Sequence, residues 1–192
     1  TQCQYLLDGV PLNNVSFTSD LGIIIDPNLS FKLHLSTIIS KALQRVGVFF
    51  RGFSSRRLDI VRKTVITYIR PLLEYNSIVW NPVHKYLVDK IESVQRQFTK
   101  RIASISHLSY LERLQILGLE PLELRRLHFD VIQHYKIFNN MSSINQSDYF
   151  THHHPSAFSR KPQSFLIKPL NKPNYLPTSF FIDQWTAGIH SQ

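Results

Sequence analysis

Two stretches of the sequence decide the fold. The first reads Arg70-Pro71-Leu72-Leu73-Glu74-Tyr75-Asn76-Ser77-Ile78-Val79-Trp80-Asn81-Pro82. The second reads Ile91-Glu92-Ser93-Val94-Gln95-Arg96-Gln97-Phe98-Thr99-Lys100-Arg101. Ile91, Val94 and Phe98 recur at the three- and four-residue spacing of one helix face. The second stretch is therefore predicted to be helical, and in the first stretch Pro71 is expected to kink or restart a helix because proline removes a backbone donor.

Further helices are predicted on both sides. Apolar residues recur at helical steps over residues 31–50, with Ser30 as the expected N-cap and Gly52 as the expected end. A second helix follows residues 54–55, and its apolar stripe consists of Leu58, Val61, Val65, Tyr68 and Leu72. The second stretch belongs to a third helix over about residues 83–103, whose inward residues are Leu87, Ile91, Val94, Phe98 and Ile102.

A short helix and a last long helix complete the predicted bundle. Ser109 and Glu112 have the spacing of a capping box, and Gly118 is the expected end of that helix. Pro121 stands at the first turn of a helix expected over Leu122 to about Phe138. The residues of this helix expected to face the bundle are Leu124, Leu127, Val131, Tyr135 and Phe138.

The two ends of the chain differ from this helical middle. Apolar residues flank Asp8-Gly9, a two-residue turn signal, and further strands are expected at Val15–Phe17 and Leu21–Ile25. After Asn139-Asn140 the pattern dissolves into Ser, Asn, Pro and His with scattered aromatics. The predicted fold is mainly α: a small N-terminal β unit, a helical bundle and an irregular C-terminal tail, over residues 1–29, 30–140 and 141–192.

Three residues of the first stretch are assigned to structure rather than to catalysis. Glu74 has no second acid or base within helical reach, so it is expected to pair with an arginine. Tyr75 and Trp80 are expected to fill the core between helices with their polar tips bonded. Base stacking on these aromatics is the alternative. Gln95 is expected to reach a backbone group or a base.

Charge is concentrated in the middle of the chain. Residues 1–31 hold three acidic side chains and no Lys or Arg, and residues 102–192 hold eight basic against six acidic. Residues 32–101 hold fourteen basic against four acidic, so they carry the excess of a chain whose net charge is +9. Clustered positive charge is the electrostatic footprint of a surface that meets phosphates. A solvated basic surface with no specific partner is the alternative.

Beyond these patterns, the order of several motifs resembles a known family. The pattern Arg-Pro-x-Leu-Glu-Tyr, Trp-Asn-Pro and Ile-Glu-x-Val-Gln-Arg is similar to the region that follows the palm in reverse transcriptases of non-LTR (LINE-type, jockey-like) retrotransposons. The same order is followed by residues 20–31, 109–114, 124–126 and 135–137. The resemblance covers residues 5–138 as an ordered set, and motif matches of this kind are hypotheses about structure and role.

The resemblance implies a helical thumb, which holds template and primer while the palm performs RNA-directed DNA synthesis. Residues 1–29 would correspond to the end of the palm, and their apolar run would pack on a palm that lies before Thr1. The family draws its catalytic carboxylates from an Asp-Asp pair, which would hold Mg²⁺ ions. No two acidic residues are adjacent here. The chain is therefore expected to be the C-terminal part of a longer polyprotein, or a genomic remnant of one, without catalytic residues or a cofactor of its own.

Ten basic residues are the candidate nucleic-acid contacts. Arg56, Lys63 and Arg70 are spaced by seven, which predicts one basic ridge on the second helix. The full candidate set is Lys41, Arg45, Arg51, Arg56, Arg57, Lys63, Arg70, Arg96, Lys100 and Arg101. Their expected partner is an RNA/DNA template–primer, beside the palm and fingers of the parent polyprotein. The alternative function is a helical protein-interaction module that docks on the rest of a polyprotein or on another partner.

Other function classes find no support in the sequence. Cys3 is the single cysteine, so no intrachain disulfide forms and a reducing compartment is expected. No signal peptide and no apolar run of about 20 residues is present, which predicts a soluble intracellular protein, with the nucleus as its expected location, and no membrane partner. The adjacent residues His152-His153-His154 point apart and are not expected to bind a metal. The sequence contains no phosphate-binding loop and no nucleophile elbow, so no small-molecule substrate is expected.

Overall fold

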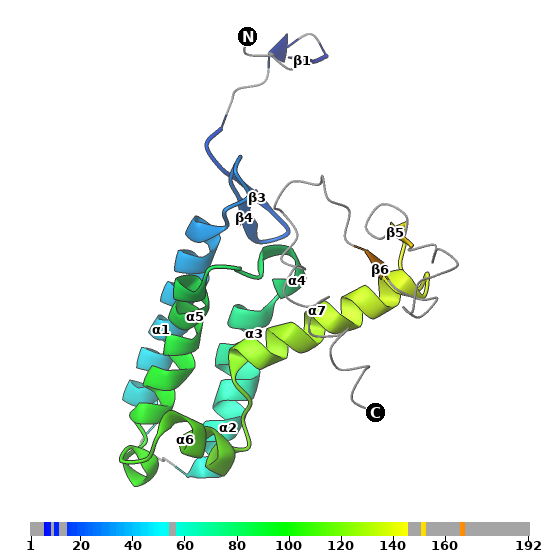
Figure 1. The fold of residues 1–192 in the computed structure, drawn as a ribbon. Helices are drawn as coiled ribbons and strands as arrows, with labels where there is room; N and C mark the ends of the chain where they lie inside the picture. Colours follow the sequence, from blue (N-terminus) through cyan, green and yellow to red (C-terminus); the bar gives the residue numbers. More distant parts are fainter. Residues whose placement is uncertain are drawn as a thin grey trace, which may run out of the picture.

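The structure, a computed structural model, describes residues 6–8, 10–11, 15–53, 57–145, 151–152 and 166–167. Figure 1 shows a mainly helical protein with short antiparallel strands before the first helix. This confirms the predicted fold class of a small β unit followed by a helical bundle. Most of the predicted irregular tail lies outside the described residues; among its described parts, β5 (Thr151–His152) and β6 (Leu166–Ile167) form an antiparallel pair.

The N-terminal strands form two hairpins. Their bounds are β1 (Leu6–Leu7), β2 (Val10–Pro11), β3 (Thr18–Asp20) and β4 (Ile23–Ile25). The first hairpin pairs around the predicted turn, but the expected strand over residues 15–17 is wrong, because the second pairs residues 18–20. Leu21 and Gly22 have φ angles of 46° and 82° and make the two-residue turn. Ile23 is buried against α1 (Lys32–Gly52), so part of this apolar run packs on the chain itself.

Nine helical segments lie within residues 32–138 of the described chain. After α1 they are α2 (Leu58–Thr64), the π-helical turn η1 (Val65–Ile69), α3 (Arg70–Glu74), α4 (Ser77–Trp80), α5 (Lys85–Lys100), the 3₁₀ turn η2 (Ala103–Ile105), α6 (Tyr110–Leu117) and α7 (Leu122–Phe138). In Figure 1, α1 and α5 run side by side in the same direction, α2 to α3 lie along α1, and α7 crosses beside α3 and α4.

The start of α1 is held by an aspartate rather than by the expected N-cap. The Asp26 carboxylate accepts backbone hydrogen bonds from Asn28 and Phe31, each at 3.0 Å, and from Ser30 at 3.1 Å. These bonds, led by the one from Ser30, lower the pKa of Asp26. Phe31 takes the cap position with a left-handed φ of 51°, so the assignment of Ser30 as N-cap is wrong by one residue.

A π-helical turn changes which side chains face the core after α2. Pro71 has no N–H and its ring crowds the carbonyl four residues earlier, which a wider turn relieves. The backbone N–H of Arg70 accordingly donates to the carbonyl of Val65, five residues earlier. Tyr68 is therefore 40% exposed and Ile69 only 2%, so the expected stripe through Tyr68 is wrong. The predicted restart at Pro71 is confirmed, because α3 begins at Arg70.

The core is centred on α5 and Trp80. All five residues expected to point inward from the third helix are buried, although α5 itself ends at Lys100 and Ile102 follows it. Trp80 is 1% exposed and its indole Nε1 donates to the carbonyl of Tyr75 at 2.9 Å, as predicted. Tyr75 is 57% exposed, so its assignment to the core is wrong.

The last two helices begin where the sequence predicts, but α7 faces the bundle with a different side. The capping box of Ser109 and Glu112 is present, and Gly118 ends α6 with a φ of 58°. The residues of α7 that are buried are Leu122, Arg126, Asp130 and Ile137. The expected inward face is wrong, since Tyr135 is 60% exposed and Val131 39%. Polar partners explain the difference: Asn81 bonds both Arg126 and Asp130.

Candidate nucleic-acid interface

The structure places the candidate cations in two groups on either flank of α1. Eight of the nine that lie within the described residues are at least partly exposed, and Arg70 is the exception. The tenth, Arg56, lies outside the described residues. One group borders the seam between α1 and α2–η1, and the other surrounds the ends of α1 and α5.

The seam group consists of Lys41 and Arg45 on α1 and Lys63 on α2. Lys41 and Arg45 are four residues apart, so they lie one above the other on the same helix face. Nη1 of Arg45 donates to the backbone carbonyl of Tyr68 at 2.6 Å, and its guanidinium carbon lies 4.7 Å from the centroid of that ring. Arg45 thus joins α1 to η1 while remaining half-buried. Lys41 and Lys63 are exposed.

The end group gathers at the C-terminal ends of α1 and α5. The guanidinium of Arg101 lies 5.1 Å from the ring centroid of Phe50, which brings the two helix ends together. Arg51 lies beside Gly47 on its own helix. Nζ of Lys100 donates to the carbonyl of Ser106 at 2.8 Å. Cations at helix C-termini also stabilise the helix dipole, so this group has a structural role beside any phosphate contact.

Arg96 stands one turn before Lys100 on the same face of α5, as predicted. Its guanidinium lies 4.9 Å from the ring centroid of Tyr110 on α6. Tyr110 in turn donates to the carboxylate of Glu92, and Gln95 donates to the carbonyl of Glu120 at 2.9 Å. The expectation that Gln95 reaches a backbone group is thus confirmed. The bond to Glu92 holds the Tyr110 ring against which the exposed Arg96 side chain lies.

Arg70 does not belong to the basic surface. Its side chain is 10% exposed, and Nε lies 3.6 Å from a carboxylate oxygen of Glu74. Glu74 also receives Nε of Arg125 at 2.6 Å, so its predicted pairing with an arginine is confirmed. The expected ridge through Arg70 is wrong, because the π-helical turn rotates the residues after it. Burial lowers the pKa of Arg70.

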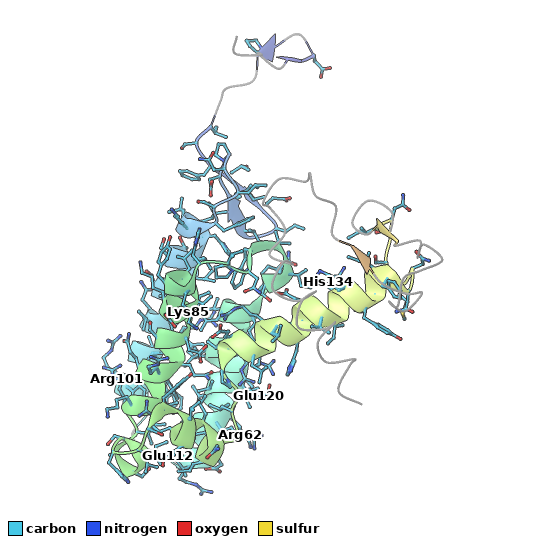
Figure 2. The ribbon with its side chains drawn as sticks, viewed as in Figure 1. Arg62, Lys85, Arg101, Glu112, Glu120 and His134 are labelled. Carbon is cyan, nitrogen blue, oxygen red and sulfur yellow. The ribbon has the colours of Figure 1, made fainter. Side chains whose placement is uncertain are left out.

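Acidic side chains interrupt the basic surface at the start of α2 and at the tip of α6. Arg57 is exposed but pairs with Asp59, with 3.2 Å between Nη2 and Oδ2. Figure 2 shows Arg62, Arg101 and Glu112 at the same end of the bundle. Arg62 is an exposed cation that the sequence pattern did not single out, and its guanidinium lies against Gly118.

The structure also bears on metal sites and on membrane-spanning helices. Across the described parts of the chain, no cluster of three or more His, Cys, Asp or Glu side chains is arranged to hold a metal ion. His153 and His154 of the histidine run lie outside those parts. None of the described helices combines the length and the apolar character needed to cross a membrane.

The chain is similar to a known protein over part of its length. An uncharacterized protein of Caenorhabditis elegans is 25% identical to this chain over 128 residues. The match spans 65% of this chain and 63% of that protein, so the chain covers less than two thirds of its relative. No protein-family model and no solved structure matches the chain. The relative's name states no activity, and the resemblance to reverse transcriptases remains an expectation.

The residue missed by the sequence analysis is Tyr68. Helical periodicity assigns it to the core, whereas the structure exposes it beside Arg45 and Lys63. Pro71 was the available signal, since a proline three residues later can force the preceding turn to widen. Pro71 alone does not predict which of the neighbouring side chains the widened turn exposes.

Proposed function

We propose that this chain is the thumb region of a non-LTR retrotransposon reverse transcriptase and holds an RNA/DNA template–primer through its basic helix faces. The observation that carries the proposal is the exposed seam of Lys41, Arg45 and Lys63. Phosphate contacts of this kind set affinity and register without reading sequence. The ordered motifs of residues 5–138 supply the family, and the parent enzyme would supply the Mg²⁺-binding carboxylates. A nuclear location is part of the proposal.

The seam provides a sharper test than the helix ends. Lys100 and Arg101 take part in closing or joining helix ends, so their replacement confounds binding with stability. Lys41 and Lys63 are exposed, so their side chains can be shortened without opening the core. Glutamine at position 45 keeps the aliphatic stem of arginine without its charge; it is too short to reach the carbonyl of Tyr68, but the bond that is lost is exposed to solvent. A triple variant at these positions therefore removes charge at small structural cost.

The triple variant Lys41→Ala, Arg45→Gln, Lys63→Ala is expected to bind an RNA/DNA hybrid more weakly and with less salt dependence. Each phosphate contact contributes roughly 0.9 to the slope of log affinity against log salt concentration, so the slope should become about 2 to 3 less steep. Fluorescence anisotropy with a labelled hybrid at several salt concentrations measures it. Circular dichroism checks that the variant remains folded.

Lys85→Ala is the matched control for this experiment. Lys85 is exposed, lies outside the candidate set, and pairs with Glu123 at 3.0 Å. The control should leave the affinity for the hybrid and its salt dependence nearly unchanged. An affinity of the wild-type chain that is indifferent to salt, or an equal loss in the triple variant and in Lys85→Ala, would contradict the proposal.

A second candidate function is a helical protein-interaction module, and the exposed apolar side of α7 favours it. Ile132 and Tyr135 are 50% and 60% exposed, and α4, which packs on α7, exposes Ile78 and Val79. If this side binds a second copy, sedimentation velocity should show association that rises with protein concentration. The double variant Ile132→Ser, Tyr135→Ser should abolish that association without affecting hybrid binding. A monomer at every concentration would remove self-association from consideration.

A further inference from the structure

A hollow lies at one end of the basic seam, between the last turns of α1 and the outer side of α2 and η1. Its volume is about 350 Å³, within the range of small-ligand pockets. The side chains that shape it include Val48, Phe53, Ile60, Lys63, Thr67 and Tyr68. Val48, Phe53 and Tyr68 are 48%, 57% and 40% exposed, so apolar and aromatic surface is open to solvent there.

The charges around this hollow are positive. Lys63 forms part of its wall on α2. On α1, Lys41 and Arg45 continue along the helix face that leads to Val48, at steps of four and three residues. Asp59 is the acidic residue nearest along α2, and Arg57 already pairs with it. An anionic ligand with an apolar, flat portion therefore matches the site better than an acidic or purely aliphatic one.

The polar groups of the hollow are poorly placed to read a specific pattern of donors and acceptors. The hydroxyl of Thr64 donates to the carbonyl of Ile60 at 2.9 Å, and that of Thr67 donates to the carbonyl of Lys63 at 2.8 Å. Both hydroxyl hydrogens are thus used within the helix. What remains is the tyrosine ring, the apolar walls and the ammonium of Lys63. Such a site favours stacking and electrostatic attraction over base-specific hydrogen bonds.

The π-helical turn is the structural device that exposes Tyr68. A regular helix would turn this residue toward the core, and the wider turn instead leaves it at the rim. The Arg45 side chain then holds it there through the carbonyl bond and the ring contact. Single-turn π-helical segments occur frequently at functional sites, which agrees with a role for the residue they reposition here.

We infer that this hollow receives one unpaired nucleobase of a single-stranded nucleic acid. The base would stack on Tyr68 and contact Val48, while the neighbouring phosphates would meet Lys63, Arg45 and Lys41. This inference rests on the proposed function and deepens it, because it distinguishes unpaired strand from duplex. Base stacking on an aromatic side chain is tolerant of sequence, so any base is expected to serve.

The test compares two oligonucleotide probes on the full chain. One is a single-stranded oligothymidine, and the other is a strand of equal length and charge in which several central nucleotides are abasic. The intact strand is expected to bind about tenfold more tightly, since stacking of one base on an aromatic side chain contributes at that scale. Tyr68→Ser should remove most of this difference, and Tyr68→Phe should preserve it because the ring is kept.

Tyr135→Ser is the matched control, since Tyr135 is also an exposed tyrosine but lies on α7. It should leave the preference for the intact strand unchanged. A 2-aminopurine placed in the strand gives an independent readout, because its fluorescence should fall on binding to wild type and much less on binding to Tyr68→Ser.

The outcomes separate this inference from the proposed function. Equal affinity for the intact and abasic strands would overturn the base site, while salt-dependent binding of hybrid would leave the thumb proposal standing. Failure to bind both the single strands and the hybrid would defeat the two together. If Tyr68→Ser changes self-association but not oligonucleotide binding, a second copy of the chain occupies the hollow. That result would also overturn the inference.

Discussion

Replacing Glu74 with alanine is expected to lower the free energy of unfolding by about 3 to 5 kcal/mol, the usual cost of breaking a buried ion pair. The Glu74 side chain is 9% exposed and lies between Arg70 and Arg125. Its carboxylate receives Nε and Nη2 of Arg125 at 2.6 and 3.0 Å. Without it, two guanidinium groups would face each other in a largely dry space.

The electrostatic directions agree with this picture. Burial lowers the pKa of Arg70, the nearby charge of Arg125 lowers it further, and Glu74 acts against both. The hydrogen bond to Glu74 is the main reason that the pKa of Arg125 is raised. Glu74 therefore compensates two cations at once, and it also joins α3 to α7.

Urea denaturation followed by circular dichroism measures the loss, and Asp59→Ala is the control. Asp59 pairs with Arg57, but the two side chains are 54% and 76% exposed, so water screens the pair and its loss should change the free energy of unfolding only slightly. Glu74→Gln keeps the shape of the side chain and one acceptor oxygen. Its loss in free energy of unfolding should therefore lie between those of Glu74→Ala and Asp59→Ala. Similar losses for Glu74→Ala and Asp59→Ala would show that the cluster is not a buried electrostatic unit.

Local sequence signals predicted the parts of the fold that depend on local physics. The capping box at Ser109 needs only residues within one turn, and it is present. The inward face of α5 follows from strict apolar periodicity, and its residues are buried. The pairing of Glu74 with an arginine was expected because no second acid or base lies within helical reach of it, but the sequence could not identify Arg125, which lies 51 residues away.

Two errors have different physical origins, one in partners that are distant along the chain and one in a local change of helical pitch. On α7 the apolar stripe through Val131 and Tyr135 is a better helical face than the one observed. The observed face wins because Asn81 accepts from Arg126 at 3.1 Å and donates to Asp130, which brings polar residues inward. On η1 the widened turn exposes Tyr68 and buries Arg70. Periodicity assumes a constant 3.6 residues per turn and fails where that assumption does.

The sequence predicted which segment of the chain is basic, but only partly which of its residues form a surface. Charge counting identified residues 32–101, and the exposed cations Lys41, Lys63 and Arg101 lie within that range. The hollow beside them was not predictable, because it depends on the exposure of Tyr68 after the π-helical turn. Clustered charge therefore indicates where phosphates could bind, whereas the shape of a site requires the three-dimensional packing of two helices.

Glu92→Ala is expected to lower the free energy of unfolding by a similar amount, about 3 to 5 kcal/mol, because it leaves three donors without a partner. The Glu92 carboxylate accepts from the backbone N–H groups of Leu122 and Glu123, each at 3.2 Å, and from the hydroxyl of Tyr110. It thus holds the first turn of α7, where a negative charge is also favoured by the helix dipole.

Two control variants separate these contributions in chemical denaturation. Glu92→Gln keeps an acceptor oxygen and loses the charge, so its loss should be clearly smaller than that of Glu92→Ala. Glu123→Ala removes an exposed carboxylate from the same turn and should cost less than about 1 kcal/mol. An effect of Glu92→Ala no larger than that of Glu123→Ala would mean that the buried bonds contribute little.

The same cluster predicts how stability depends on pH. Burial raises the pKa of Tyr110 above its ordinary value of 10.0, and the hydrogen bond to Glu92 raises it further. The unfolded chain therefore loses this proton first, so the contribution of Tyr110 is fully present below pH 10 and is lost as the pH rises toward the folded pKa. In Glu92→Ala the folded pKa should lie closer to 10, and the decline attributable to Tyr110 should be smaller. The free energy of unfolding is measured against pH for wild type and for Glu92→Ala, each with and without Tyr110→Phe. The difference that Tyr110→Phe makes in each background isolates the decline due to Tyr110. Identical declines with and without Glu92 would contradict the coupling.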